Sequence, residues 1–518
     1  MSYALRIVSH GLTGIRRLDP GLAGLRATAV TMTATLTAYA AALLLEHAEH
    51  LHTVILVQAV ALTLTLSRTR PGTTPSDRII ALAVLPPVAV AAAETSALMS
   101  RHPTAGDTVF TALICATIAV RRFGPRATKA GTLAVLPLIA VLVTPPGGLA
   151  PGHDQDKWAG LVALIAVLCG LTAQWTADRL RITRPAAAFP PAPAPAGGGR
   201  RLSASTRMSL QMGGAVGAGF AAGHLLFPQH WAWSVLTAFV VCSGARGRAD
   251  VVHKGVLRTA GAAAGTAAAT MIAGTFGPHD TRSIAVIFAV LAAATWLRPA
   301  GYAYWAGFVT AALSLLYGYF GQSAPDLLTT RLEAIVVGAV LGIAASWLIL
   351  PIRSIDVLRR RTADALAALG EFLAAARQEP GRLADHQARF DGCLHRLEQI
   401  AGPLRAHRRL RRRAVPHPAD AIDAVRRCAA PVHTIARCAA ETGQTLTTPD
   451  IVRLNAAVTA DLTRARLAVG RRPLTPPRPP APAPAAPGPS PHERLRTALL
   501  ELDAAVRSLP PIFAPADA

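Results

Sequence analysis

The sequence predicts an all-α polytopic membrane protein: two six-helix parallel repeats, about twelve transmembrane helices in total, followed by a cytoplasmic helical bundle. Residues 27–176 and 205–350 each contain about six apolar stretches, and the two regions can be aligned with each other. Over the whole chain 52% of the residues are hydrophobic and only 16% are charged, which is less charge than a soluble protein of this length carries. These observations indicate that most of the chain lies in a bilayer.

The apolar stretches define the expected membrane spans. In the first repeat they cover residues 27–45, 51–67, 79–99, 108–120, 131–144 and 158–176. In the second repeat they cover residues 207–227, 230–244, 257–276, 283–297, 301–320 and 334–350. An upright helix needs about 20 residues to cross a bilayer. The shortest stretches are therefore expected to include short or broken helices.

The internal duplication is clearest at the start of each half. Residues 26–50 align without a gap with residues 207–231, and further on residues 122–131 match residues 298–307. An even number of helices per repeat gives both halves the same orientation in the membrane. The sequence therefore predicts parallel repeats.

The formal net charge is +23, and the positions of the basic residues indicate which loops face the cytoplasm. Basic residues gather in alternate connections, such as the one holding Arg68, Arg70 and Arg78, whereas the opposite connections of the first half hold Arg101 and Lys157 almost alone. Cytoplasmic loops carry an excess of Lys and Arg. We therefore expect a multi-pass protein of the cytoplasmic membrane with both termini in the cytoplasm, and not a nucleic-acid-binding protein.

The remaining segments differ from the repeats in composition. Beyond the second repeat, apolar residues recur at three- and four-residue steps, the spacing of amphipathic helices. Proline- and glycine-rich segments cannot form a helix or a core and are expected to be linkers. The expected domains are a cytoplasmic N-terminus (1–26), the first repeat (27–176), a linker (177–204), the second repeat (205–351), a cytoplasmic helical domain (352–472), a proline-rich segment (473–491) and a short C-terminal helix with its tail (492–518).

Two motifs in the second repeat resemble a known family. Trp231-Ala-Trp-Ser-Val-Leu-Thr, followed by Arg258-Thr-Ala-Gly261-Ala-Ala-Ala-Gly265, resembles the fusaric acid resistance (FUSC) family of transporter-like integral membrane proteins, which includes aromatic acid exporters. Members typically pair a Trp-x-x-Leu-Thr helix with an Arg-x-x-Gly-Thr-x-x-Gly helix start, and this chain has Ala262 in place of the Thr. The resemblance covers the second repeat well. The first half lacks the aligned glycines and is expected to be a degenerate repeat.

The resemblance and the chemistry of the side chains suggest a substrate path. Arg258 and Arg298 are expected at cytoplasmic helix ends, where fixed positive charges attract carboxylates. Aromatic and polar side chains along the path are expected at Trp231, Trp233, Thr237 and Tyr304. The alternative is ordinary membrane anchoring, because Arg gathers on the cytoplasmic side and Trp and Tyr gather at both interfaces.

Pairs of glycines four residues apart occur within the spans of the second repeat. Glycine at this spacing lets helix backbones approach closely, and the alternative is a flexible segment lining a pathway. The residues expected to pack helices together are Gly213, Gly217, Gly219, Gly223, Gly261, Gly265, Gly338 and Gly342.

Glu94 and Glu333 are the acidic residues expected closest to membrane depth. Ionisable groups in lipid are costly and serve functions such as proton coupling, although both residues lie near outer helix ends, where they reach water. The basic run from His407 to Arg413 suits anionic lipid head groups, or else forms a solvated helix surface. The sequence contains no motif that predicts a cofactor, a metal site or an enzyme.

The leading hypothesis is gradient-driven efflux of small organic anions, such as aromatic carboxylic acids, by a membrane-embedded homodimer. Its other partners would be the lipid bilayer and a protein that the sequence does not identify. One alternative is a passive anion channel, because plant aluminium-activated malate channels resemble the same membrane unit. The other is a scaffold or sensor that transports nothing.

Overall fold

The computed structural model describes most of the chain. The described residues are 19, 22–49, 54–69, 74–143, 155–182, 203–273, 275–321, 325–378, 380–410, 416–442, 448–474, 476 and 490–513. Most of the predicted N-terminal segment, linker and proline-rich segment lies outside them. Every regular element in the described part is a helix, which confirms the all-helical prediction there.

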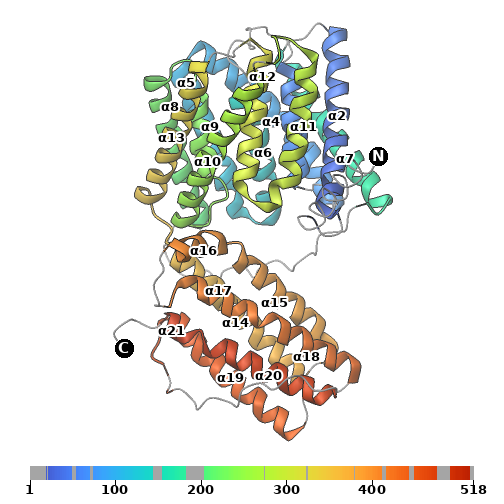
Figure 1. The fold of residues 1–518 in the computed structure, drawn as a ribbon, viewed down its shortest axis with the longest axis vertical. Coiled ribbons are helices and arrows are strands. Elements are labelled where there is room, and N and C mark those ends of the chain that lie inside the picture. The colour runs from blue at the N-terminus through green and yellow to red at the C-terminus, as the bar shows by residue number, and fades with distance from the viewer. Residues whose placement is uncertain are drawn as a thin grey trace, which may run out of the picture. The chain divides into compact units, whose positions relative to one another are not determined.

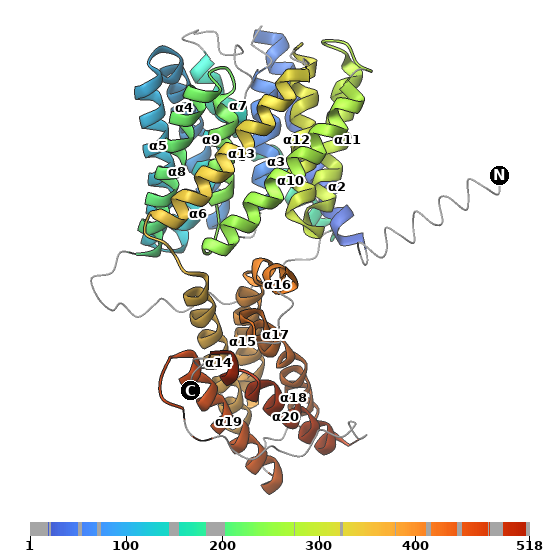
Figure 2. The same cartoon turned by 60° about the vertical axis from the view of Figure 1, so that its left-hand side comes forward.

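The chain separates into two compact units. The first comprises the chain up to Pro351 except for residues 187–199 and 246–250, and the second comprises those residues and the chain from Ile352 onward. Figures 1 and 2 show the helices of the first unit running side by side.

Each expected span of the first unit overlaps a helix. The first half forms α2 (Ala23–Glu49), α3 (Val54–Thr69), α4 (Pro75–Arg101), α5 (Pro103–Ala119), the 3-10 helix η2 (Val120–Phe123), α6 (Pro125–Val143) and α7 (Gln155–Arg179). The second half forms α8 (Ala204–Leu226), α9 (Trp231–Cys242), α10 (Arg248–Ala273), α11 (Thr281–Leu297), the 3-10 helix η3 (Arg298–Ala300), α12 (Tyr302–Tyr319) and α13 (Pro325–Leu348).

Seven of the described helices are long and apolar enough to cross a membrane. They are Ala23–Glu49, Pro75–Arg101, Pro103–Phe123, Pro125–Val143, Trp158–Arg179, Thr281–Ala300 and Thr329–Leu348. Two more stretches, Ile55–Ser67 and Trp231–Cys242, are apolar but shorter. The protein is thus a multi-pass membrane protein, while the arrangement as twelve spans in two parallel repeats stays a prediction.

Short polar side chains cap the N-termini of several of these helices. The carboxylate of Asp19 accepts hydrogen bonds from the backbone N–H groups of Gly24 (3.0 Å) and Leu25 (2.8 Å) at the start of α2. Ser203 accepts one from Thr206 N at the start of α8, and Asp280 accepts one from Arg282 N at the start of α11. Such caps satisfy backbone donors that the first turn of a helix leaves open.

Glycines allow α10 and α12 to cross closely. A Cβ atom on Gly265 would lie 2.0 Å from the carbonyl oxygen of Gly307, and one on Gly261 would lie 2.4 Å from that of Ala303. Real Cβ atoms do not approach backbone atoms this closely, so both positions need glycine. The backbones of α10 and α12 therefore touch at two positions about one helical turn apart.

The other glycines that were expected to pack helices have varied surroundings. A Cβ on Gly219 or Gly223 would approach backbone atoms of α9 at 3.2 and 3.0 Å. Cβ atoms on Gly338 and Gly342 would likewise meet carbonyl oxygens of α9, at 2.4 and 3.3 Å. One on Gly213 would lie 2.6 Å from Cys115 Sγ, whereas one on Gly217 would meet nothing within 4 Å.

The second unit is a bundle of amphipathic helices. From Ile352 onward it contains α14 (Ser354–Gln378), η4 (Pro380–Arg382), α15 (Leu383–Glu398), α16 (Ala401–Leu410), α17 (Pro418–Arg427), α18 (Ala429–Thr442), α19 (Pro449–Val469), α20 (Pro491–Arg507) and α21 (Pro510–Phe513). Leu366, Leu369 and Phe372 of α14 and Phe390 of α15 are fully buried in its core. Burying each such side chain contributes about 1.5–3 kcal/mol.

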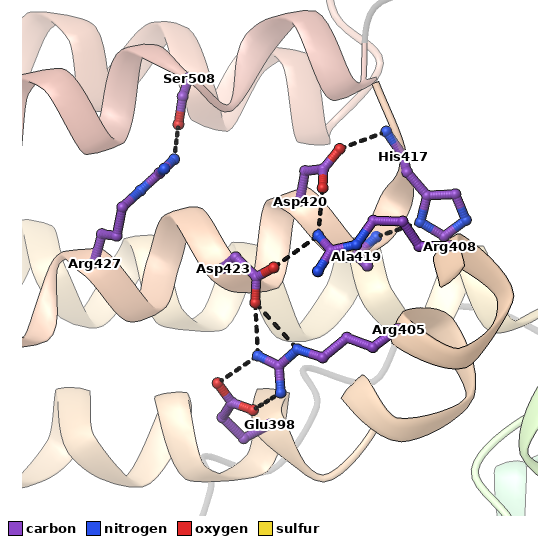
Figure 3. A network of polar contacts seen from close by, with 9 residues as sticks. All are labelled: Glu398, Arg405, Arg408, His417, Ala419, Asp420, Asp423, Arg427 and Ser508. Atoms are coloured by element: carbon purple, nitrogen blue, oxygen red, sulfur yellow. Dashed lines mark hydrogen bonds and ion pairs between the residues drawn. The ribbon is translucent and has the colours of Figure 1, made fainter. Parts of the chain in front are cut away.

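Two arginines of α16 are neutralised by acids (Figure 3). Arg405 donates to Glu398 Oε2 at 2.9 Å and to Asp423 Oδ1 at 2.7 Å, and Arg408 donates to Asp423 Oδ2 at 2.7 Å. Arg408 also pairs with Asp420. Arg408 belongs to the basic run for which lipid head groups and a solvated helix surface were the two interpretations, and its charge is already compensated within the bundle. Residues 411–413 of that run lie outside the described part.

Substituting Asp423 by asparagine is expected to destabilise the second unit by about 1–3 kcal/mol, because the amide keeps one acceptor oxygen but loses the negative charge and places an NH2 donor beside two guanidinium groups. Burial alone would raise the pKa of Asp423, but hydrogen bonds from Arg405 and Arg408 outweigh it and lower that pKa. The stabilisation is therefore complete above the pKa of the unfolded chain and is lost as the pH falls through the lower pKa of the folded state.

This effect can be measured by pulse proteolysis of the full-length protein in urea. Glu371→Gln is the matched control, because among the described residues Glu371 forms an ion pair with Arg389 alone and both side chains are exposed. The loss of this pair should cost less than about 1 kcal/mol. Equal destabilisation by the two substitutions at pH 7 would contradict the expectation, as would a difference that persists unchanged at pH 3.

Candidate functional site

The first unit contains a cavity of about 280 Å³ whose walls come from both halves of the chain. Helices α2, α3 and α6 of the first half and α9 to α12 of the second half contribute to it. Most of the lining is aliphatic. Its aromatic members are Tyr39, Phe288, Tyr302, Trp305, Tyr319 and Phe320. The volume lies just below the usual range for small-molecule sites, about 300–1,000 Å³, and therefore suits a small ligand.

Arg258 is the one charged side chain among the described residues that line this cavity. Its side chain is buried, with only 4% of the residue exposed. Its Nη1 donates to Thr310 Oγ1 at 3.3 Å, and its Nε has no hydrogen-bond partner in the described part of the chain. Burying an uncompensated cation costs several kcal/mol. A negatively charged group beside Arg258 would offset this cost.

The position of Arg258 follows from its spacing to the glycines of α10. Residues three and seven positions apart lie on one face of a helix, so Arg258, Gly261 and Gly265 share a face. The glycines bring this face against α12, which carries Thr310. The sequence predicted a helix end near Arg258, but α10 begins at Arg248. Arg258 therefore lies nearly three turns inside the helix.

The other predicted path residues lie outside the cavity lining. Arg298 is exposed in η3, and its guanidinium lies 5.7 Å from the ring centroid of Trp305, which lines the cavity. Tyr304 is 55% exposed. Trp231 packs against His224 and Phe220, with ring centroids 5.2 and 5.4 Å apart.

Two further predicted path residues are buried between helices. Trp233 is 4% exposed and packs against Tyr317, with ring centroids 5.8 Å apart. Thr237 is fully buried at the crossing of α9 with α13, where its Cβ lies near Gly338. Both residues therefore lie between α9, α12 and α13, and the ring centroid of Trp233 lies 5.4 Å from the guanidinium of a second buried arginine, Arg331.

Glu94 and Glu333 are exposed on the surface of the first unit, so neither faces the cavity. A different acidic residue makes a polar contact between the two halves. Asp107 of α5 lies with its Oδ2 2.8 Å from Nε2 of His224 on α8, while its Oδ1 is buried and has no hydrogen-bond partner among the described residues. Sequence reasoning missed this pair, because Asp107 fell just outside the predicted span 108–120.

The described residues contain no group of three or more His, Cys, Asp or Glu side chains that could hold a metal ion. The described lining of the cavity combines the Arg258 guanidinium, which contacts the hydroxyl group of Thr310, with apolar and aromatic walls.

A comparison with known protein families finds a match in the second half of the first unit. Residues 215–345 match the family described as fusaric acid resistance protein-like, which is the resemblance that the motifs of α9 and α10 predicted. The matched segment includes Arg258 and the helices that contribute the second-half walls of the cavity. A comparison of the chain with curated proteins finds no match.

Proposed function

We propose that the first unit carries small organic anions out of the cell, because its cavity places a buried arginine, which no carboxylate of the described residues neutralises, among apolar and aromatic walls. Arg258 would bind the carboxylate, and Phe288, Tyr302 and Trp305 would contact a planar, apolar body. A single cation among the described lining residues favours substrates with one negative charge over dianions. Aromatic monocarboxylates fit this description best, and the match to the fusaric acid resistance protein-like family supports a transporter.

We also propose where the protein lies, how it assembles and what drives it. The chain would lie in the cytoplasmic membrane as twelve spans with both termini in the cytoplasm, and the second unit would be a cytoplasmic bundle through which two copies associate. Energy would come from the proton or voltage gradient. A passive anion channel and a scaffold that transports nothing are the competing functions.

The decisive experiment measures efflux from cells that have been preloaded with a panel of aromatic and aliphatic carboxylates. Cells with the intact protein, with Arg258→Ala and with neither are compared, each with and without an uncoupler. We expect faster efflux of aromatic monocarboxylates that is lost in the variant and sensitive to the uncoupler. Voltage-dependent current that needs no proton gradient would favour the channel, and equal efflux in all three strains would favour the scaffold.

Coupling to protons is expected to depend on Asp107. Asparagine keeps the size of the side chain and one hydrogen bond to His224 but cannot carry a proton. In proteoliposomes, Asp107→Asn should therefore slow efflux driven by a proton gradient at least about tenfold, as expected for a missing proton carrier, while substrate exchange without a gradient continues.

Glu94→Gln and Glu333→Gln are the matched controls for this prediction, because both residues are acidic, were expected to couple protons, and are exposed. They should leave gradient-driven efflux unchanged. If either of them removes the response to the gradient and Asp107→Asn does not, the coupling group is that glutamate and not Asp107.

A further inference from the structure

A second arginine, Arg331 of α13, is buried in the same unit. Only 2% of the residue is exposed. Its guanidinium carbon lies 4.0 Å from the ring centroid of Tyr317 on α12 and 5.4 Å from that of Trp233 on α9. No described carboxylate forms an ion pair with it. Two aromatic rings thus take the place of a counter-ion around its charge.

Two nitrogen atoms of the Arg331 guanidinium lack hydrogen-bond partners among the described residues. They are the Nε and Nη2 atoms, and both are buried. Aromatic rings interact with the faces of a guanidinium group and leave its N–H donors unsatisfied. Nε and Nη2 form the edge that binds a carboxylate or phosphate through two parallel hydrogen bonds. The unsatisfied donors are therefore the pair that a bidentate anion needs.

Arg331 lies close to the cavity that contains Arg258. Leu313 lines the cavity and also belongs to the buried cluster formed by Trp233 and Tyr317. On α12, the partner of Arg258 is Thr310 and the partner of Arg331 is Tyr317. Seven residues are about two helical turns, or roughly 10 Å along the axis, and residues at this spacing share a face. One face of α12 thus connects the two arginines.

We propose that Arg331 is a second anion-binding position, which receives the carboxylate of the transported molecule after it leaves Arg258. This inference rests on the proposed function. The anion binds the open edge of the guanidinium while Tyr317 and Trp233 hold its faces. Leu313 lies between the two positions, so its side chain must move for the substrate to pass. A purely structural arginine would need no such open edge.

The test compares binding and transport in the same purified protein. The probe is radiolabelled benzoate, measured by equilibrium binding in nanodiscs and by efflux from proteoliposomes. We expect Arg331→Gln to lose one of two binding positions per chain and to slow efflux at least about tenfold, the scale of a lost charged hydrogen bond. Arg331→Lys should show a smaller loss than Arg331→Gln, because an ammonium group keeps the charge but lacks the bidentate edge. Arg282→Gln, which removes an exposed arginine of α11, should change neither property.

A second measurement separates this inference from the proposed function. Line broadening of chloride in ³⁵Cl NMR reports small anions that bind to the protein whether or not an organic acid binds. The inference is supported if Arg331→Gln reduces the chloride broadening and the variant protein remains monodisperse. This holds even if benzoate does not bind the wild-type protein. If benzoate displaces the chloride, the organic anion is the ligand of Arg331. If benzoate does not displace it, the position binds an inorganic anion, and the proposed transfer of the carboxylate from Arg258 to Arg331 is overturned. Unchanged broadening and unchanged efflux in both Arg331 variants overturn the inference, while efflux by the wild type leaves the proposed function intact.

Discussion

Alanine at position 265 is expected to destabilise the first unit by about 2–4 kcal/mol, which is the cost of overpacking a closed contact. The added methyl group would lie 2.0 Å from the carbonyl oxygen of Gly307 and 2.8 Å from its carbonyl carbon. Both are backbone atoms, so no side-chain rotation relieves the clash and α10 must move away from α12. The movement would also separate Arg258 from Thr310.

Gly217→Ala is the control for this substitution. Gly217 is also a helical glycine in the second half, but a Cβ there meets nothing within 4 Å. Since alanine is about 1 kcal/mol more favourable than glycine inside a helix, this variant should be as stable as the wild type or slightly more stable. Unfolding in SDS, followed by circular dichroism, gives both values. Equal stabilities of the two variants would mean that the close crossing of α10 and α12 is not needed.

Arg258→Gln is expected to weaken binding of an aromatic monocarboxylate between about tenfold and a hundredfold. The variant keeps a polar side chain of similar length but removes the charge, and a hydrogen bond to a charged group is worth about 1.5–3 kcal/mol. Arg258→Lys should recover part of the affinity, because lysine keeps the charge but not the planar fork of donors. Equilibrium binding to the purified protein measures each value directly.

The matched control is Arg298→Gln. Arg298 was predicted to share the role of Arg258, but it is exposed and does not line the cavity. Its removal should change the dissociation constant less than about threefold, as is usual for an exposed charge. If Arg298→Gln weakens binding as much as Arg258→Gln, the anion binds at the surface of the first unit and not in the cavity.

The helices of the first unit were predictable because each depends on a local apolar stretch. Their ends were less predictable, because a helix continues through polar residues when capping and packing allow it. α5 begins at Pro103, where proline suits the first turn, although the apolar stretch begins at residue 108. α10 begins at Arg248 and is longer than its apolar part, which moved Arg258 from an expected helix end to the helix interior.

The candidate site was predictable only in part. Arg258 was identified from its spacing to Gly261 and Gly265, which is a local signal. The walls contributed by α2, α3 and α6 were not predicted, because the first half has no matching motif and its contribution depends on how the halves pack. The contacts of Arg331 with Tyr317 and of Asp107 with His224 also join residues far apart in the sequence. No pattern in a single sequence indicates that these residues contact each other.

Because α2, α3 and α6 face α9 to α12 around one cavity, a molecule that fills it touches both halves of the chain at once. A ligand that binds only the folded state raises the free energy of unfolding, by about 2.7 kcal/mol at a hundredfold excess over its dissociation constant. A ligand in the cavity would therefore act as a removable cross-link between the halves. The melting temperature of the purified protein should rise with a compound that fills the cavity, so a chemical library can be searched for ligands by this measurement alone.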